Sequence, residues 1–564
     1  MRARFPAICT AIVLIVAACG TAAPASPSPA ASTAASAPAS SAPSASPSAA
    51  ARESLLRVAR ISDFLPSIHP TSLGTGNQEL MADIMFSTLV DVDIDEVTIL
   101  PDLATEWTAS PDAKTYTFKL NPAAVWSDGE PVNVDDVIYT ISWANQNPTA
   151  FQQLGVVAWL NTAGGDAVEG TKDVPSGLKK IDDHTIEITL EVADSTYLRR
   201  LAGAVYYIQP EHLLKDLTAA EAATCDFCLG VAGKTPGSGP YDITTSISAT
   251  GANFTAKTGY WKGKDGPVKE LVYKIQESNV SVAQLAAGEL DLVIRVPPTE
   301  GPGLANVAGL KQLNVPGVGI FAMNFNHNTT DKALRQAMAY AINREEIISS
   351  VLGGLATINY TIPPGFHGIP GVLDSINKYD FNVETAKAKL AESSWDPSKT
   401  VRLMSLAQDP NFTLTAPALQ QSLQDNLGLK VEITELATAP YTEALIGNDW
   451  DIYLSFGGSE GVGWYQSQQY YACGEGAPNY LKLTEDRGDC IYDEQFEAAA
   501  AVTGEPQTEI LNKLAKDLNE NLPEIYLWQP NYLHVYSDRL GGDFGIYPNE
   551  RESFQKILEW TYAP

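Results

Sequence analysis

The sequence predicts an α/β protein with at least two lobes, and three observations lead to this. The chain has 564 residues, several times the roughly 100–150 residues of a typical domain. Its first half is rich in alternating strand patterns and turns, whereas its second half places helical patterns before short strands. Hydrophobic residues make up 45% and charged residues 18%, an ordinary globular balance that allows large cores.

The first residues predict export. Arg2 and Arg4 precede an apolar run from Ala7 to Val16 and a cut site of small residues, which is the pattern of a secretory signal peptide over residues 1–18. Residues 16–19 (VAAC) resemble the bacterial lipobox, in which the cut falls before a cysteine that then carries a diacylglycerol. This implies lipidation of Cys19; an ordinary cleaved signal followed by a stray cysteine is the alternative.

Residues 19–52 are predicted to be a flexible linker that carries the lipid. Positions 20–51 contain only Ala, Ser, Pro, Thr and Gly, and such a tract has no large apolar side chain to pack. Beyond the signal, no stretch reaches the roughly 18 apolar residues of a membrane helix. We therefore expect an exported protein, anchored by lipid to the outer face of the cytoplasmic membrane and otherwise not inserted in it.

Charge and cysteine content reduce the number of possible functions. There are 37 Lys and Arg against 67 Asp and Glu, a net charge of −30, which argues against binding of nucleic acid.

Without Cys9 in the signal and the acylated Cys19, four cysteines remain, and an even number in an oxidising compartment suggests disulfides. The favoured pairs are Cys225–Cys228 and Cys473–Cys490. A redox or zinc role for the C-x-x-C at 225–228 is the less favoured alternative, because no second C-x-x-C and no neighbouring His accompany it. No cofactor or metal is expected.

Individual elements follow from local patterns. Strands are predicted near residues 55–60, at 116–120 and at 185–190, where apolar and polar residues alternate. Residues 332–351 read as one helix, with Asp331 as its N-cap and Gly353 and Gly354 as its end. Helices at 384–390 and 416–427 and a strand at 430–433 follow, and this order predicts a partly parallel sheet. No internal repeat is evident.

Several segments together resemble one family, the extracellular solute-binding proteins of family 5, which are receptors of ABC importers for peptides, nickel and oligosaccharides. The segments occur in the family's order, at 101–107 (PDLATEW), 126–132 (WSDGEPV), 237–241 (GSGPY), 260–263 (YWKG), 287–292 (AGELDL), 323–326 (MNFN) with 334–342 (LRQAMAYAI), and 379–387 (YDFNVETAK). We expect these segments to be turns, caps and core positions that define the fold rather than ligand contacts.

The resemblance implies a two-lobed, periplasmic-binding-protein-like fold of the large class, with an extra subdomain in lobe I and a ligand cleft between the lobes. Lobe I would comprise residues 53–323 and a return segment at 523–564, and lobe II residues 324–522. Such a protein closes over its solute and delivers it to a membrane permease. The resemblance therefore implies a non-enzymatic receptor, expected to be a monomer, with oligopeptides as the favoured ligand.

One position in the sequence leaves the class of ligand undecided. Peptide-binding members use an Asp to pair with the peptide's ammonium, and Ser459 stands at the matching place with Glu460 beside it. A buried ammonium facing only a hydroxyl would be poorly paired, so either Glu460 takes that role or the ligand has no ammonium there. Oligosaccharides or another neutral solute are the alternative. The candidate ligand-binding residues are Thr71, Ser72, Trp450, Gly457, Gly458, Ser459, Glu460, Trp464, Tyr465 and Trp528.

An enzyme is the competing class. The six His are scattered and no His-Glu-x-x-His zinc motif occurs. Carboxylates are abundant, so counting alone leaves a glycosidase-like hydrolase open; the resemblance argues against it. His69 lies in the loop that the family places at the cleft border, and we interpret it as a turn residue.

Overall fold

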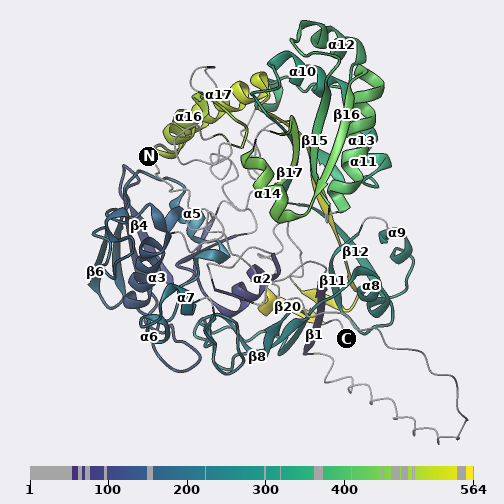
Figure 1. Ribbon diagram of the computed structural model, residues 1–564. Coiled ribbons are helices and arrows are strands. Elements are labelled where there is room, and N and C mark those ends of the chain that lie inside the picture. The colour runs from purple at the N-terminus through teal and green to yellow at the C-terminus, as the bar shows by residue number, and fades with distance from the viewer. Residues whose placement is uncertain are drawn as a thin grey trace, which may run out of the picture.

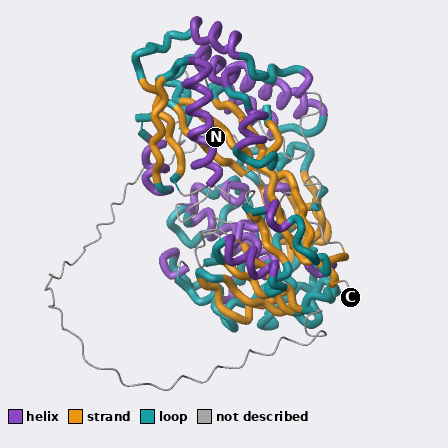
Figure 2. Tube along the Cα trace, turned by 90° about the vertical axis from the view of Figure 1, so that its right-hand side faces the viewer, coloured by secondary structure: helices purple, strands orange, loops and turns teal. Residues whose placement is uncertain are grey.

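The computed structural model describes residues 54–60, 67–69, 76–93, 98–148, 157–222, 224–297, 300–317, 319–360, 372–407, 410–447, 449–458, 471, 480–484, 487, 490–542, 554 and 556–562. Its main feature is a sheet of 12 strands in the order β16-β15-β17-β13-β18-β11-β1-β10-β9-β8, with β12 and β14 also pairing with β18. Figures 1 and 2 show that the sheet is divided between two bodies, one above the other, which strands connect.

The lower half-sheet belongs to the expected lobe I. It consists of β1 (Leu55–Arg60), β8 (Tyr241–Ser248), β9 (Gly251–Ala256), β10 (Glu270–Ile275), β11 (Leu292–Val296), β12 (Leu310–Pro316) and the last part of β18 (Glu524–Ser537). Strand β1 pairs in parallel with both β10 and β11, and β11 pairs antiparallel with β18. Helices α2 (Gly76–Met85), α8 (Ser278–Ala286) and α9 (Gly301–Leu304) accompany it.

The upper half-sheet belongs to the expected lobe II and has the same pattern of strand pairing. It consists of β13 (Gly319–Phe325), β14 (Ala356–Ile358), β15 (Thr400–Leu406), β16 (Lys430–Leu436), β17 (Ile452–Gly458) and the first part of β18. Strand β15 pairs in parallel with β16 and β17, and β17 pairs antiparallel with β13. Both halves thus hold three parallel strands followed by one antiparallel strand.

Each half-sheet also contains an Arg–Asp ion pair at the equivalent position. In the lower half, the backbone N and Nε of Arg57 donate to Asp291 Oδ2 at 2.8 and 2.9 Å, and its Nη2 donates to Oδ1 at 2.8 Å. In the upper half, Arg402 makes the same three bonds to Asp451 at 2.9, 2.9 and 2.8 Å. Each Asp immediately precedes the strand that pairs with the strand of its Arg. The structure therefore contains an internal repeat that the sequence pattern does not reveal.

Helices cover both faces of the upper half-sheet (Figure 1). One core joins the sheet to α10 (Lys332–Ala341), α11 (Arg344–Ser350), α12 (Val383–Glu392) and α13 (Pro410–Leu427). A second core, on the opposite face, joins it to α14 (Thr438–Ile446), α16 (Ile491–Ala500) and α17 (Glu505–Asn521). Successive strand residues alternate between the two cores, as a strand buried on both faces requires.

The helix predicted at 332–351 is in fact two helices. Asp331 caps α10 as predicted, since its side chain accepts a hydrogen bond from the backbone N of Leu334 at 2.8 Å. The chain then turns extended at Ile342, and Asn343 caps α11 by accepting from the backbone N of Glu346 at 3.2 Å. The prediction missed this break because the apolar spacing continues through it.

A subdomain at the left of Figure 1 is inserted in lobe I. Its sheet runs β4 (Ala104–Ala109), β5 (Thr115–Leu120), β7 (Thr185–Thr189), β6 (Leu178–Asp182), with α3 (Val134–Gln146) packed beside it. The remaining short elements are β2 (Val90–Val92), β3 (Ile99–Pro101), α4 (Val157–Leu160), η3 (Asp166–Val168), α5 (Tyr197–Leu201), η4 (Ala204–Tyr206), α6 (Glu211–Leu214), α7 (Ala219–Ala222), η6 (Val372–Asp374), β19 (Leu540–Gly542), η8 (Ile557–Glu559) and β20 (Trp560–Tyr562).

Family segments that lie far apart in the sequence meet in this part of the structure. Lys262 Nζ lies 2.6 Å from Asp102 Oδ1, and Trp261 donates to the carbonyl of Ser238 at 2.7 Å. Burial alone would lower the pKa of Lys262, but the Asp102 carboxylate reverses this and raises it above its usual value. These contacts confirm that the segments at 101–107, 237–241 and 260–263 build the scaffold.

Two strand segments connect the half-sheets. Strand β18 is 14 residues long; its first part pairs with β13 and β14, and its last part with β11 and β12. The other connection runs from β12 to β13, and the whole of β13 lies in the upper half. The pairings change from one half-sheet to the other after residue 317 and near residue 530. The lobe boundaries at 323/324 and 522/523 stay a prediction.

Candidate functional site

The candidate site lies where β17 ends beside the two connecting segments. In open α/β sheets, ligands bind beyond the carboxyl ends of the parallel strands. Strand β17 ends with Gly457 and Gly458, which pair with Ile320 and Gly319 of β13. The structure therefore places two of the predicted site residues at the junction of the half-sheets.

Phe456 is an exposed aromatic residue at this junction that the sequence analysis missed. Its side chain is 37% exposed, and its ring covers Gly319 so closely that a Cβ there would lie 2.1 Å from a ring atom. A side chain at position 319 would therefore have to displace the Phe456 ring. An exposed aromatic face at the carboxyl end of a central strand is suited to contact a ligand.

Two asparagines of the segment at 323–326 fix β17 in place. Asn324 donates through Nδ2 to Ser455 Oγ at 2.7 Å, and Asn326 donates through Nδ2 to the carbonyl of Trp450 at 2.9 Å. Both side chains are buried, where unpaired amides would be costly. These bonds connect the family segment directly to the strand that carries Phe456, Gly457 and Gly458.

Trp450 and Trp528 are core residues in the structure, contrary to their predicted role as ligand contacts. Each is 1% exposed. The Trp450 ring meets the Tyr453 ring edge-on at 5.0 Å, and the Trp528 ring stacks on Phe321 at 5.7 Å. A tryptophan near a strand end fits either role in sequence, and tertiary packing decides between them.

The other predicted site positions lie outside the described residues. These are Thr71, Ser72, Ser459, Glu460, Trp464 and Tyr465, together with Cys19 and Cys473. His69 is described and fully buried, with its ring 5.1 Å from that of Trp143. Burial lowers the pKa of His69 to about 4, so its imidazole is neutral at physiological pH. This agrees with its interpretation as a turn residue.

The predicted disulfide between Cys225 and Cys228 is present, with 5.0 Å between the Cα atoms. Cys490 is also disulfide-bonded, and its pairing with Cys473 stays a prediction. The described residues contain no group of three or more His, Cys, Asp or Glu placed to hold a metal ion.

A hollow of about 500 Å³ lies elsewhere on the upper body. Its lining includes Asp331, Trp395, Lys399, Arg402 and Asp451. Arg402 stands near the amino end of β15, and Asp451 immediately before β17. The hollow is therefore at the opposite edge of the sheet from Gly457 and Gly458, and we do not assign the ligand to it.

The bodies also touch away from the connecting strands. The backbone N of Ser195, in the inserted subdomain, donates to the carbonyl of Ala500 at the end of α16, at 2.9 Å. Gln507 of α17 donates through Nε2 to Ser195 Oγ at 3.0 Å and to the carbonyls of Ala499 and Val502. This contact joins the two bodies on the side of α16 and α17.

A buried acid lies on the α17 side of β18. Glu524 is hydrogen-bonded by the hydroxyl of Tyr471, which also contacts the hydroxyl of Tyr526. Burial raises the pKa of Glu524, and the two tyrosine hydroxyls offset this only in part. The folded state therefore binds this proton more tightly than the unfolded chain does.

We expect wild-type stability, relative to Glu524→Gln, to decrease as pH rises. A raised folded pKa gives stability that is complete below the unfolded value of about 4.3 and is lost as pH rises through the folded value. Denaturant unfolding of both proteins between pH 4 and 8 checks this, with the exposed Glu435→Gln as the matched control. A difference that is constant with pH, or that favours wild type at high pH, would contradict the assignment.

Comparison with known proteins identifies the family. The family model described as bacterial extracellular solute-binding proteins, family 5 middle, matches residues 98–477, which is more than half of the chain. The chain belongs to family 5 of these solute-binding proteins. This confirms the resemblance, and members of the family are transport receptors rather than enzymes.

Among curated relatives, Di/tripeptide-binding protein 1 of Pseudomonas aeruginosa (strain UCBPP-PA14) is 24% identical over 531 residues, covering 86% of this chain and 91% of the relative. Among solved structures, the oligopeptide-binding protein AppA of Bacillus subtilis, in complex with a nonapeptide, has a TM-score of 0.71 at 18% identity and covers 90% of this chain and 99% of its own. NikZ of Campylobacter jejuni, in complex with Ni(L-His), has a TM-score of 0.73 at 18% identity and covers 90% and 99% of the two chains.

These likenesses confirm the two-lobed fold of this family 5 protein. They agree with its mixed α/β architecture and large sheet. Within the described residues, no helix is both long enough and apolar enough to span a membrane.

One sequence pattern could suggest a hydrolase instead. Residues 457–461 (GGSEG) have the Gly-x-Ser-x-Gly spacing of a serine nucleophile turn, a match that the sequence analysis overlooked when it looked for enzyme motifs. Such a serine needs a histidine within hydrogen-bond reach. His327 follows β13, whose end pairs with Ile452 at the amino end of β17, so the full length of β17 separates it from Gly458. His69 is buried against Trp143. Neither histidine supports a hydrolase here.

Proposed function

We propose that this protein is the substrate-binding receptor of an ABC importer for oligopeptides. The observation that carries the proposal is the pair of half-sheets with the same pattern of strand pairing. Two strand segments join them, and the carboxyl end of β17 lies at the junction. Two connecting strands allow the bodies to rotate through small backbone changes. A ligand held between them shifts the population toward the closed form, and that form docks on the permease.

The contact of Ser195 with Ala500 and Gln507 supports closure as the working motion. It joins the inserted subdomain to α16 and α17 through two hydrogen bonds. A small polar contact of this kind forms when the bodies approach and separates again at little cost. Rotation about the connecting strands would make or break it with ligand binding.

Peptide is the ligand class that the relatives favour. The P. aeruginosa relative is named for di- and tripeptides and spans most of this chain. We propose that Phe456 contributes an aromatic wall and that Glu460 takes the place of the aspartate that pairs with the peptide ammonium. Glu460→Gln should then weaken peptide binding. A neutral solute such as an oligosaccharide is the second candidate, because Ser459 stands where that aspartate is expected.

Export and anchoring complete the proposal. Membership of an extracellular family agrees with the signal pattern at 1–18. We propose that the lipid on Cys19 and the linker at 19–52 hold a monomeric receptor near its permease. The tether raises the effective concentration of the receptor at the permease and leaves the receptor free to rotate.

A thermal-shift screen tests the ligand class. A ligand at about 100 times its Kd stabilises the folded protein by roughly 2.7 kcal/mol. We expect di- to oligopeptides to raise the Tm, cello- and xylo-oligosaccharides to leave it unchanged, and Glu460→Gln to reduce the peptide effect. A Tm rise with the sugars and none with the peptides would replace the proposal by its alternative.

A further inference from the structure

The segment at residues 67–69 lies in the loop that follows β1, on the lobe I side of the junction. Its backbone is hydrogen-bonded at Ser67 and at Ile68. Gln78 donates to the carbonyl of Ser67 at 2.8 Å, and the hydroxyl of Tyr207 donates to the carbonyl of Ile68 at 2.6 Å. The backbone N of Ile68 donates to the carbonyl of Cys228 at 3.0 Å, and Ser67 Oγ donates to the same carbonyl at 3.1 Å.

The Cys228 carbonyl therefore receives two of these bonds, and a disulfide fixes its direction. Cys225 and Cys228 are bridged, and the backbone N of Cys228 donates to Cys225 Sγ at 3.0 Å. The backbone N of Leu229 donates to the carbonyl of Cys225 at 3.0 Å. Cys228 is fully buried. We call residues 225–230 the disulfide turn.

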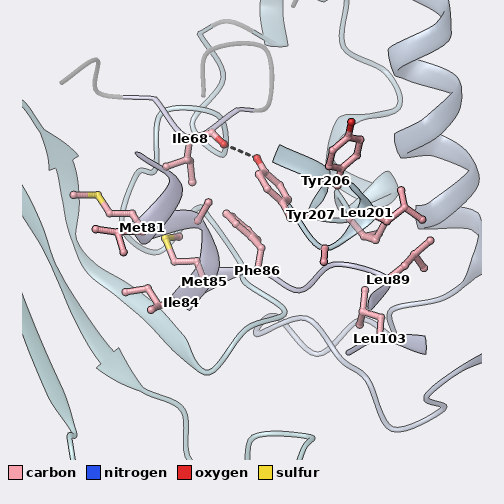
Figure 3. Packing of buried hydrophobic residues seen from close by; sticks show 14 of the residues in the cluster. Ile68, Met81, Ile84, Met85, Phe86, Leu89, Leu103, Leu201, Tyr206 and Tyr207 are labelled. Atoms are coloured by element: carbon pink, nitrogen blue, oxygen red, sulfur yellow. Dashed lines mark hydrogen bonds between the residues drawn. The ribbon is translucent and has the colours of Figure 1, made fainter. Parts of the chain in front are cut away.

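Aromatic packing connects the disulfide turn to the segment a second time. Phe227 of the turn lies against Phe86, with 5.5 Å between ring centres, and Phe86 stacks on Tyr207 at 4.3 Å. Figure 3 shows Phe86 beside Tyr207 and the bond from the Tyr207 hydroxyl to Ile68. Ile68 is thus held at its N–H by the turn and at its carbonyl by Tyr207, which is linked to the turn through Phe86.

The bridge is poorly suited to global stabilisation. In the chain-entropy account, the stabilisation by a disulfide grows with the number of residues it encloses, and this one spans a separation of 3. What it restricts is the local conformation of its own turn, and hence the direction of the Cys228 carbonyl.

We infer that the disulfide turn is a positioning element for the lobe I side of the ligand site, which acts by fixing the segment at 67–69. The inference rests on the proposed function in one respect, that the loop after β1 borders the ligand. Ligands bind beyond the carboxyl ends of parallel strands, and β1 is the central parallel strand of its half-sheet. A loosened segment would have to be ordered again when ligand binds, which lowers affinity.

The test compares three variants with wild type. The double change C225S/C228S removes the bridge. Asp226→Ala alters an exposed side chain inside the same turn and keeps the bridge, so it is the matched control. Tyr207→Phe removes only the hydroxyl that Ile68 accepts from and keeps the ring on Phe86, so it tests the segment even if the double variant folds poorly. The measurements are amide hydrogen exchange across the chain, Tm, and the Kd for a peptide that binds wild type.

We expect C225S/C228S and Tyr207→Phe to accelerate exchange at residues 67–69 selectively and to weaken peptide binding about tenfold, the equivalent of one hydrogen bond. Asp226→Ala should match wild type. Unchanged exchange at 67–69, or exchange raised equally throughout the chain, would overturn the inference. If wild type binds no peptide, the proposed function fails, and the exchange pattern of the variants alone decides whether the turn fixes the segment.

Discussion

Trp528→Ala is expected to lower the free energy of unfolding by about 3–5 kcal/mol, the usual cost of truncating a buried tryptophan. The Trp528 side chain is 1% exposed and stacks on Phe321 where β18 approaches the junction. Its loss leaves a cavity in the core that packs the sheet against α10, α11, α12 and α13. Chemical denaturation followed by circular dichroism measures the change.

Phe456→Ala is the matched control for this change, because Phe456 is also aromatic and lies at the same junction but is 37% exposed. It should cost much less stability and should weaken ligand binding instead. A Trp528→Ala protein of wild-type stability with impaired ligand binding would contradict the core assignment and restore the role predicted from the sequence.

Asp194→Ala is expected to have an effect of similar size, about 3–5 kcal/mol, because it breaks a buried ion pair. Asp194 is 0% exposed and contacts the Arg200 guanidinium. Its Oδ1 also accepts from the backbone N of Thr196 at 2.9 Å and from Thr196 Oγ at 2.6 Å. Removal of the carboxylate leaves the buried Arg200 guanidinium without this counter-charge and the two Thr196 donors without this acceptor.

The same change should also disturb the contact between the bodies, since the neighbouring Ser195 donates to Ala500. Gln507→Ala separates the two effects, because it removes the side-chain bond to Ser195 and leaves the ion pair intact. We expect Gln507→Ala to keep most of the stability and to weaken ligand binding by severalfold. The exposed Asp112→Ala controls for loss of a carboxylate. An Asp194→Ala protein no less stable than Asp112→Ala would show that the pair contributes little.

The general architecture could be predicted from the sequence because it rests on local signals. Alternation predicted β1 and β5, the cap at Asp331 began α10 where expected, and the even cysteine count predicted the Cys225–Cys228 bridge. The family segments were correctly interpreted as scaffold, as the pairing of Asp102 with Lys262 shows. The break between α10 and α11 was missed because the apolar residues on either side of Asn343 keep a spacing that suits one helix.

The features that could not be predicted depend on contacts between distant segments. Arg57 and Asp291 are 234 positions apart, and nothing local in either strand distinguishes this pair from other charged residues or shows its repetition at Arg402 and Asp451. The exposure of an aromatic residue is likewise a property of the folded chain. Trp450 and Trp528 were therefore assigned to the site, whereas Phe456, six residues after Trp450, was not.

Isothermal titration of ligand-free protein with short peptides tests the central claim most directly. The protein would be unfolded and refolded beforehand to remove any ligand carried through purification. The account predicts saturable binding of one peptide per chain, with a negative heat-capacity change from burial of apolar surface between the bodies. Absence of binding across a panel of di- to oligopeptides, together with saturable binding of an oligosaccharide, would contradict it.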